Sequence, residues 1–439
     1  MGQDPRIVLV NPPFHRLMGS HYNGIPHGLL SIGTVLQEKG FDALVYNADY
    51  ENRSDYLDQV GRFRKYEQYL ETYGNTNHYI WEETVDTILS LGPSHVGFTM
   101  STATFRAVSI LAEKIKQQAS EVTIIVGGVH PTIALVETMT NKDFDFAIVG
   151  EGEEALVKFL SGHLHQSING LAYRERGIIN YIPKLPIEDL DSLPVPNREL
   201  IVNPHENTEF GHIITGRGCP YACTYCASPV IWGRHQARLR SVDNVMFEIQ
   251  DICDRYPGSP IYFDDDTFTF NETRVRELCQ WIIRDYPGIK WQCHTRADCI
   301  NLSLAEAMKA AGCTTIKIGV ESGSDKILRS IRKRVTKDGI RYAAEAIKES
   351  GISLTVFLMA GFPDETDDDL KETIAFAREL KANYYNLSIV TPYYGTEMFN
   401  HWRRHLPSNH WEYFHQSPKM AFNNQLSPDL VEEFLGLNG

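Results

Sequence analysis

The sequence of 439 residues lacks the features of membrane, secreted and nucleic-acid-binding proteins. No apolar run approaches the roughly 20 residues that a membrane-spanning helix needs, and the opening stretch MGQDPRIVLVNPP has neither the basic region nor the apolar core of a signal peptide. The formal net charge is −14, whereas a nucleic-acid surface relies on clustered Lys and Arg. We therefore expect a cytoplasmic protein with no membrane span and no nucleic-acid partner.

Cysteine is also scarce, with eight in the chain. Cytoplasmic thiols stay reduced, so we do not expect a disulfide framework. Five cysteines are scattered through periodic segments and are predicted to be buried small apolar residues: Cys253, Cys279, Cys293, Cys299 and Cys313. The other three, Cys219, Cys223 and Cys226, lie in GRGCPYACTYCASP (216–229) with the spacing Cys-x3-Cys-x2-Cys, and no fourth cysteine follows nearby.

Residues 6–160 alternate short β-rich runs with helical patterns, which predicts a parallel, doubly wound, Rossmann-like sheet. The predicted strands are 6–11, 42–48, 95–100, 123–128 and 145–150, and the predicted helices lie near 27–39, 81–91, 104–119, 131–140 and 152–161. Such sheets bind ligands at the carboxyl ends of their strands, which here read NPPF, STAT, GGVHPT and GEGEE. Ordinary turns need the same glycines and prolines, so the pattern alone leaves both interpretations open.

The long connection 49–80 is rich in Tyr and charge. It is either a functional lid or a surface helical excursion, and we favour the excursion. Around 170–200 the periodicity breaks down into a predicted hairpin near 175–177 and a proline-rich stretch. We therefore expect a first domain over 1–165, a hairpin and linker over 166–205, a second domain over 206–400 and a helical tail over 401–439.

The second domain shows six strand–helix repeats, which predict a partial (β/α)6 TIM-like barrel. Its strands are expected at 212–216, 260–265, 289–295, 314–320, 353–360 and 384–390, with helices near 241–256, 272–286, 302–311, 337–350 and 366–381. Active sites of such barrels lie at the carboxyl ends of the strands. Polar motifs follow five of the six predicted strands: the cysteine triplet, DDDTF (264–268), His294 with Arg296, ESGS (321–324) and GFPDET (361–366).

The three clustered cysteines are one ligand short of the usual sites. A structural zinc site would need a fourth Cys or His, and His235 lies nine residues beyond Cys226, where we expect it at the surface. A fully protein-held iron–sulfur cluster would need four thiolates. Three thiolates on a [4Fe–4S] cluster leave one iron for a ligand that is not protein, which suits a cofactor that chelates metal and receives an electron.

This motif, with Tyr225 before the third cysteine, resembles the signature of the radical S-adenosylmethionine (radical SAM) enzymes. In that family S-adenosylmethionine chelates the open iron and is cleaved to a 5′-deoxyadenosyl radical that abstracts hydrogen from the substrate. The motifs NPP, GGVHPT, GEGE, the DD pair, GVESG, GFPDET and TPYYGTEMF resemble the members that carry an N-terminal cobalamin-binding-type domain, over residues 6 to about 400. The absence of an Asp-x-His-x-x-Gly motif leaves no histidine placed as a lower cobalt ligand, so this domain could be vestigial.

The resemblance implies cofactors and site residues. The cluster would be held by Cys219, Cys223 and Cys226. The S-adenosylmethionine site would comprise Tyr225, Asp264, Arg296, Glu321 and Ser322. The corrin of cobalamin would be lined by Asn11, Pro12, Ser101, Thr102, Gly127, Gly128, His130 and Gly150.

Two reactions follow from the resemblance. The first is cobalamin-dependent methylation of an unactivated centre in a small molecule or natural-product intermediate, with an external electron donor such as flavodoxin or ferredoxin. The alternative is a cobalamin-independent radical dehydratase, mutase or cyclase, for example on an aminoglycoside-type sugar. That reaction would need an acid or base, for which Glu321, His294 and Asp265 are the candidates. The complete cysteine set argues against a corrinoid carrier without catalysis.

Overall fold

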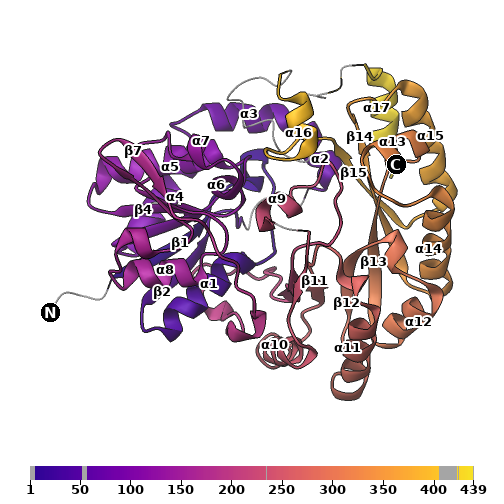
Figure 1. The fold of residues 1–439 in the computed structure, drawn as a ribbon, viewed down its shortest axis with the longest axis horizontal. Coiled ribbons are helices and arrows are strands. Elements are labelled where there is room, and N and C mark those ends of the chain that lie inside the picture. Colours follow the sequence, from indigo (N-terminus) through magenta and orange to yellow (C-terminus); the bar gives the residue numbers. More distant parts are fainter. Residues whose placement is uncertain (1–4, 52–56, 234, 405–422, 424, 439) are drawn as a thin grey trace. The chain divides into compact units, whose positions relative to one another are not determined.

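The computed structural model describes residues 5–51, 57–233, 235–404, 423 and 425–438. Residues 52–56 of the predicted insertion, and 405–422, 424 and 439 of the predicted tail, lie outside the described residues. Among the described residues the chain forms two compact units, one up to residue 208 and one from residue 209 onward. Figure 1 shows the helices and strands of each unit.

The first unit is built on a seven-stranded sheet in the order β2-β1-β3-β4-β5-β6-β7. Five strands pair in parallel: β1 (Arg6–Asn11), β2 (Asp42–Asn47), β3 (His95–Thr99), β4 (Thr123–Gly127) and β5 (Phe146–Ile148). Ile7 to Val10 are all at most 1% exposed, as expected for a strand covered on both faces. The doubly wound sheet predicted from these runs is confirmed.

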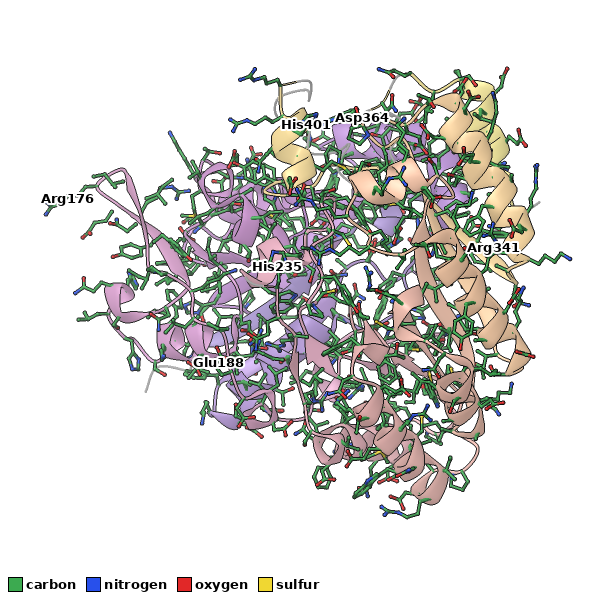
Figure 2. The ribbon with its side chains drawn as sticks, turned by 45° about the vertical axis from the view of Figure 1, so that its right-hand side comes forward. Arg176, Glu188, His235, Arg341, Asp364 and His401 are labelled. Carbon is green, nitrogen blue, oxygen red and sulfur yellow. The ribbon has the colours of Figure 1, made fainter. Side chains whose placement is uncertain are left out.

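The predicted hairpin joins β6 (Leu171–Glu175) to β7 (Ile178–Tyr181), and β6 pairs antiparallel with β5. Its turn residues Arg176 and Gly177 have φ of 51° and 81°. Two positive φ values suit the tight turn that matches the twist of a hairpin. Arg176 lies at the tip of this hairpin in Figure 2. The hairpin, which lies within the predicted linker range 166–205, thus extends the sheet.

Helices pack on both faces of the first sheet. The described helices with more than six residues are α1 (His27–Glu38), α3 (Tyr66–Gly74), α4 (Tyr79–Ser90), α5 (Phe105–Gln118) and α8 (Glu153–Leu160). Leu9 faces α1, because a Cβ added at Gly33 would lie 3.5 Å from it, whereas Val8 and Val10 join the core that contains α4 and α5. The helix predicted near 131–140 is broken into α6 (Val129–Ile133) and α7 (Leu135–Thr138), because Ala134 leaves the helical region at φ −134° and ψ 49°.

The insertion after β2 is not a surface excursion, which corrects the interpretation we favoured. It forms α2 (Gln59–Arg64) and α3, and three tyrosines of α3 are at most 3% exposed: Tyr66, Tyr69 and Tyr73. The hydroxyls of Tyr69 and Tyr73 donate to the Ala103 carbonyl at 3.4 and 3.1 Å. The insertion is therefore anchored in the core and bonded to the loop that follows β3.

The second unit contains a six-stranded parallel sheet in the order β15-β14-β13-β12-β11-β8. The strands are β8 (His212–Ile213), β11 (Ile261–Phe263), β12 (Trp291–Arg296), β13 (Cys313–Glu321), β14 (Ser353–Ala360) and β15 (Tyr384–Ile389). The helices between them are α10 (Val242–Arg255), α11 (Glu272–Asp285), α12 (Leu302–Ala310), α14 (Lys337–Glu349) and α15 (Asp367–Leu380). Helices α11, α12, α14 and α15 cover one face of this sheet (Figure 1), which confirms the partial barrel.

Shorter elements complete the second unit. The predicted strand 212–216 is split into β8 and β9 (Gly216–Arg217), and β9 pairs antiparallel with β10 (Arg238–Leu239). Four short helices follow the strand ends or close the chain: α9 (Ser228–Trp232), α13 (Asp325–Ser330), α16 (Glu397–Trp402) and α17 (Pro428–Leu435). No helix of the described chain is long and apolar enough to cross a membrane.

All eight cysteines are free thiols. Cys279, Cys293 and Cys313 are buried, as predicted. Cys253 and Cys299 are only partly buried, which corrects the prediction for these two. Cys299 follows β12 and its Sγ lies 2.9 Å from the Tyr221 hydroxyl, so a polar contact accounts for its position better than apolar packing does.

A buried carboxylate organises the loop that follows β1. Asp49, 2% exposed, accepts hydrogen bonds from the backbone N–H of Phe14 at 2.8 Å and of Arg16 at 3.1 Å. His15 Nδ1 donates to its other oxygen at 2.6 Å. Burial opposes ionisation of Asp49, but His15 and the two amides outweigh it, so the pKa of Asp49 lies below its ordinary 3.8. The charged form is therefore the one that the folded loop holds.

We expect Asp49→Asn to lower the free energy of unfolding by about 1–3 kcal/mol, because buried donors lose a charged acceptor. A folded-state pKa that is depressed gives stability above the unfolded pKa, and this stability is lost as the pH falls through the folded value. The difference between wild type and variant, measured by urea unfolding, should thus be full above pH 3.8 and shrink below it. Asp42→Asn is the control, since the surface ion pair of Asp42 with Arg6 contributes at most about 1 kcal/mol. A difference that persists unchanged at low pH would contradict this role.

Candidate functional site

The three clustered cysteines lie on one loop between β9 and α9. Gly218 starts this loop at φ +96°, and a Cβ there would lie 2.4 Å from the Gln236 carbonyl oxygen, so only glycine fits. Further along, the Thr224 N–H donates to the Ile331 carbonyl and the Thr224 carbonyl accepts from the Met398 N–H, both at 3.0 Å. The backbone between the second and third cysteines is therefore fixed from two sides.

Two thiols of this loop are held in their protonated form by burial and by the thiols beside them. The Cys226 N–H donates to the Cys223 carbonyl at 3.2 Å. Burial raises the pKa of Cys226 to about 12 and also raises that of Cys219, and the Cys223 thiol adds to both shifts. Metal binding must therefore supply the energy to deprotonate them.

The loop offers three cysteine thiols, the ligand type that holds iron–sulfur clusters. Within the described ranges, no three His, Cys, Asp or Glu side chains are grouped as one metal ion would require. A [4Fe–4S] cube presents its irons at separate corners, so its three thiolates need not converge on one point. Three cysteine ligands would leave one iron of such a cluster for another ligand.

Arg296 lies against the cysteine loop. Its Nη1 donates to Cys223 Sγ at 3.6 Å, and its guanidinium carbon lies 3.7 Å from the centroid of the Tyr221 ring. Its remaining N–H groups donate to Asp298 at 2.8 and 3.0 Å and to the Lys333 carbonyl at 2.6 Å. These contacts commit Arg296 to protein atoms, so its geometry favours support of the cysteine loop over the predicted contact with S-adenosylmethionine.

Tyr225 and Glu321 lie together beside the same loop. Burial raises the pKa of Tyr225 well above 10.0, and the Glu321 carboxylate adds to the shift by its charge and a hydrogen bond. Glu321 has φ 70° and accepts from Lys333 Nζ at 2.7 Å, with both side chains at most 9% exposed. Ser322 is fully buried, and its hydroxyl lies 2.9 Å from that of Thr373. Ser322 therefore belongs to the core beneath the site, while Tyr225 and Glu321 border it.

The three aspartates after β11 bind three different partners. Asp264 accepts from His212 Nδ1 at 2.5 Å, Asp265 from the Thr215 hydroxyl at 3.1 Å, and Asp266 from the Ser228 hydroxyl at 2.5 Å. Burial raises the pKa of Asp265 to about 7. Asp265 interacts with Cys293, whose side chain points to the opposite face from that of His294. The catalytic candidates Asp265 and His294 are thus not brought together.

Several residues around the loop were not predicted from the sequence: Thr267, whose hydroxyl lies 3.6 Å from Cys219 Sγ, and Tyr221, Asp298, Cys299 and Lys333. The position of Tyr221 inside the cysteine motif was a usable signal, whereas Lys333 is twelve residues from Glu321 and gave none. His235 is exposed, as predicted, and is labelled in Figure 2.

In the first unit, the residues predicted to line a corrin lie at the carboxyl ends of neighbouring strands. Thr102 Oγ1 lies 3.2 Å from His130 Nδ1, and Gly150 N–H donates to the Thr132 hydroxyl at 2.9 Å. Burial lowers the pKa of His130 to about 3, so its ring stays neutral. Ser101 is exposed, Pro12 is buried, and Asn11 donates to the Asn47 side chain at 2.8 Å.

The two glycines after β4 differ. Gly128 has φ +95°, and an added Cβ would lie 2.9 Å from Thr99 Oγ1 and 3.0 Å from the Met100 nitrogen, so the fold itself requires this glycine. At Gly127 a Cβ would meet no atom closer than 3.8 Å. A side chain at Gly127 would therefore make only ordinary van der Waals contacts, so the fold itself does not require glycine there, and the lack of a side chain suits the close approach of a flat ligand.

Comparisons with known proteins agree with this geometry. The model of the radical SAM superfamily matches residues 213–377, and that of the B12-binding domain matches residues 19–160. A protein of Pyrococcus horikoshii, named as an uncharacterized methyltransferase, is 33% identical over 323 residues, which cover 72% of this chain and 70% of that protein. The chain belongs to the radical SAM enzymes that carry a B12-binding domain.

Two further likenesses of this radical SAM enzyme are more distant. The anaerobic magnesium-protoporphyrin IX monomethyl ester cyclase of Rubrivivax gelatinosus is 24% identical over 340 residues, or 74% of this chain and 61% of that one. The structure of the radical S-adenosylmethionine methyltransferase TsrM from Kitasatospora setae, with cobalamin and a [4Fe–4S] cluster bound, superposes with a TM-score of 0.72 at 18% identity, over 90% of this chain and 77% of that one. The fold, the family and its cofactors, a [4Fe–4S] cluster, S-adenosylmethionine and cobalamin, are thereby confirmed; the individual ligand contacts remain predictions.

We expect Cys219→Ala, Cys223→Ala and Cys226→Ala each to abolish cluster binding and 5′-deoxyadenosine formation, because two thiolates cannot replace three. Iron content and chromatography of the S-adenosylmethionine products measure both. Cys253→Ala, in α10, is the matched control and should change only stability, by about 1 kcal/mol or less. A triplet variant that still cleaves S-adenosylmethionine would refute the assignment.

The glycine pair gives a second prediction, which concerns the corrin edge. Gly127→Val should leave the melting temperature of the protein nearly unchanged, because a Cβ there makes only ordinary van der Waals contacts, and should lower the cobalamin content measured by visible absorbance. Gly128→Val should instead destabilise the fold by more than about 1 kcal/mol whether or not cobalamin is present, because its φ is positive. Wild-type cobalamin content in Gly127→Val would move the corrin site away from this strand end.

Proposed function

We propose that the protein is a cobalamin-dependent radical SAM methyltransferase that acts on an unactivated centre of a small molecule. The observation that carries this proposal is the complete three-cysteine loop at the end of a (β/α)6 sheet, in a chain that also contains a B12-binding domain. The relative at 33% identity bears a methyltransferase name, which supports the same reaction. When bound, the cofactors supply the radical and the methyl group.

In this proposal the second unit holds the radical-forming site. Cys219, Cys223 and Cys226 would bind the cluster. Arg296 would place a positive charge and an N–H donor beside Cys223, which stabilises a thiolate there. Tyr225 and Glu321 would face the bound S-adenosylmethionine, and the Lys333 ammonium would hold the Glu321 carboxylate in place. The burial of these groups would also exclude water from the radical.

The first unit would bind cobalamin at the carboxyl ends of its strands. Gly127 would offer the close approach that a flat macrocycle needs. The neutral ring of His130 and the hydroxyl of Thr102 would form part of the wall behind it. Asn11, Pro12, Ser101 and Gly150 would complete this edge.

A cobalamin-independent dehydratase, mutase or cyclase remains the second candidate, because one relative is named as a cyclase. Its acid–base chemistry would need a side chain that is not already committed. Asp265 is bonded to Thr215 and Glu321 is paired with Lys333, which leaves His294 of the three candidates. The methyltransferase name of the relative at 33% identity supports methylation as the first candidate.

We further propose that the electron comes from an external protein such as flavodoxin or ferredoxin, and that the reaction takes place in the cytoplasm. Eight free thiols, three of them required for a cluster, suit a reducing compartment.

The decisive test is methyl transfer to the corrin. We expect protein purified without oxygen in the presence of hydroxocobalamin to retain the corrin, as its visible spectrum would show. Reduced protein incubated with S-adenosylmethionine carrying a deuterated methyl group should yield deuterated methylcobalamin and S-adenosylhomocysteine by mass spectrometry. If the protein retains no corrin yet still forms 5′-deoxyadenosine, this result would contradict methylation and favour the dehydratase, mutase or cyclase reaction.

A further inference from the structure

One face of the second sheet carries polar side chains that no step above uses. In the middle of β12 and β13, Cys293, Thr295, Ile316 and Ile318 are at most 5% exposed and point toward the covering helices. His294 and Lys317 alternate with them and are only partly buried. Since successive side chains of a strand point to opposite faces, both lie on the face turned away from helices α11, α12, α14 and α15. We call this the inner face.

His294 and Lys317 are neighbours on the inner face. They are register partners in the parallel pairing of β12 with β13, so their side chains leave adjacent strands at the same level. The Phe357 ring of the next strand lies 5.6 Å from the His294 ring, edge to face. Two polar groups therefore stand side by side, with an aromatic wall beside them.

The acidic groups of the same face are already paired. Asp264 accepts from His212 Nδ1 at 2.5 Å, and Glu209 lies 3.4 Å from His212 Nε2. Burial alone would lower the pKa of His212, but its bonds to these carboxylates raise it to about 9, so the His212 ring is charged at neutral pH. The stacked rings of His212 and Tyr262, 4.5 Å apart, add a flat surface.

The side chains of Lys317 and His294, by contrast, form no hydrogen bond or ion pair among the residues that the structure describes. The carboxylates of Asp264 and Glu209 act on Lys317 only through their charge. An ammonium carries three donors and no acceptor, and partly buried donors that lack a hydrogen-bond acceptor are unfavourable. Burial lowers the pKa of Lys317, and burial together with the Lys317 charge lowers that of His294 to about 4. His294 is therefore neutral at physiological pH and offers one N–H donor beside the ammonium.

We propose that Lys317 and His294 bind an anionic group of the substrate, a carboxylate or a phosphate, on the inner face of the barrel. This inference rests on the proposed function and names the substrate class of the same active site. The anion accepts from the Lys317 ammonium and from the ring N–H of His294, while Phe357 and the Tyr262–His212 stack contact its apolar or flat body. His294 is then a binding residue and not the general base of the alternative reaction.

The sign of the substrate charge follows from which polar groups of the inner face have no hydrogen-bond partner within the described residues. A cationic substrate would have to compete with His212 for Asp264 and Glu209, whose bonds are already made. An anionic substrate meets donors that lack an acceptor within the described structure. The net charge of −14 is therefore no guide to the site, because the charge that matters is local.

The test measures the binding of phenyl phosphate and benzoate to the full-length protein, reconstituted with its cluster and S-adenosylmethionine, by isothermal titration calorimetry. Both probes carry an anion on a flat body, and benzamide is the neutral counterpart. We expect at least one anion to bind to wild type at least tenfold more tightly than benzamide. Lys317→Met should remove most of this difference, His294→Phe should reduce it, and Lys317→Arg should retain it. Lys290→Met, an exposed lysine just before β12, is the matched control and should behave as wild type.

Equal binding of anions and benzamide to wild type would overturn the proposal, as would unchanged anion binding in Lys317→Met. If Lys317→Met does not fold, as judged by circular dichroism, the wild-type comparison and Lys317→Arg still decide it. Formation of 5′-deoxyadenosine and of deuterated methylcobalamin is measured on the same samples. Loss of anion preference with both products intact rejects only this inference, whereas absence of methyl transfer with anion preference intact rejects the proposed function.

Discussion

The cysteine loop depends on the close approach of two backbones at Gly218. The carbonyl of Gln236 occupies the space that any side chain at Gly218 would need. Glycine at this position therefore allows both the pairing of β9 with β10 and the turn that leads into the cysteines. The loop is then held by Thr224, whose N–H and carbonyl both bond to distant segments. The backbone that carries the three thiols is thus fixed before the cluster binds. This reduces the conformational entropy that is lost on cluster binding.

The charges beside this loop form a connected set of contacts. Arg296 donates hydrogen bonds to Cys223 and to the Lys333 carbonyl. The Lys333 ammonium pairs with Glu321, and Glu321 shares a hydrogen bond with Tyr225. Tyr225 lies two residues after Cys223, so the contacts return to the cysteine loop. A buried ion pair gains little stability of its own, but removal of one partner leaves an uncompensated charge. The positive φ of Glu321 is a further strained element held by this set.

The alternation of strands and helices was predictable because both sheets have continuous apolar strands between amphipathic helices. The cysteine spacing also indicated the chemistry of the loop. The sequence could not show in which direction each side chain points. Asp264, Asp265 and Asp266 are adjacent in the chain, yet each binds a partner from a different segment. The break at Ala134 depends on one backbone conformation, and the burial of the α3 tyrosines depends on tertiary contacts. The break leaves no periodic signal, whereas the tyrosines at 66, 69 and 73 do show the i, i+3, i+7 spacing of one helix face, and only their packing partners could not be predicted.

The bonds from Tyr69 and Tyr73 to Ala103 make the insertion and the 101–104 loop one cooperative unit. A transient opening of α3 would remove two hydrogen bonds from the loop that contains Ser101 and Thr102, and it would also expose part of the core that packs on the sheet. This strand end is therefore braced in part by a segment that contributes no strand to the sheet. In a related chain with a shorter insertion, the same edge would need another brace, so the insertion is a place where evolution can adjust the mobility of a binding surface while leaving its residues unchanged.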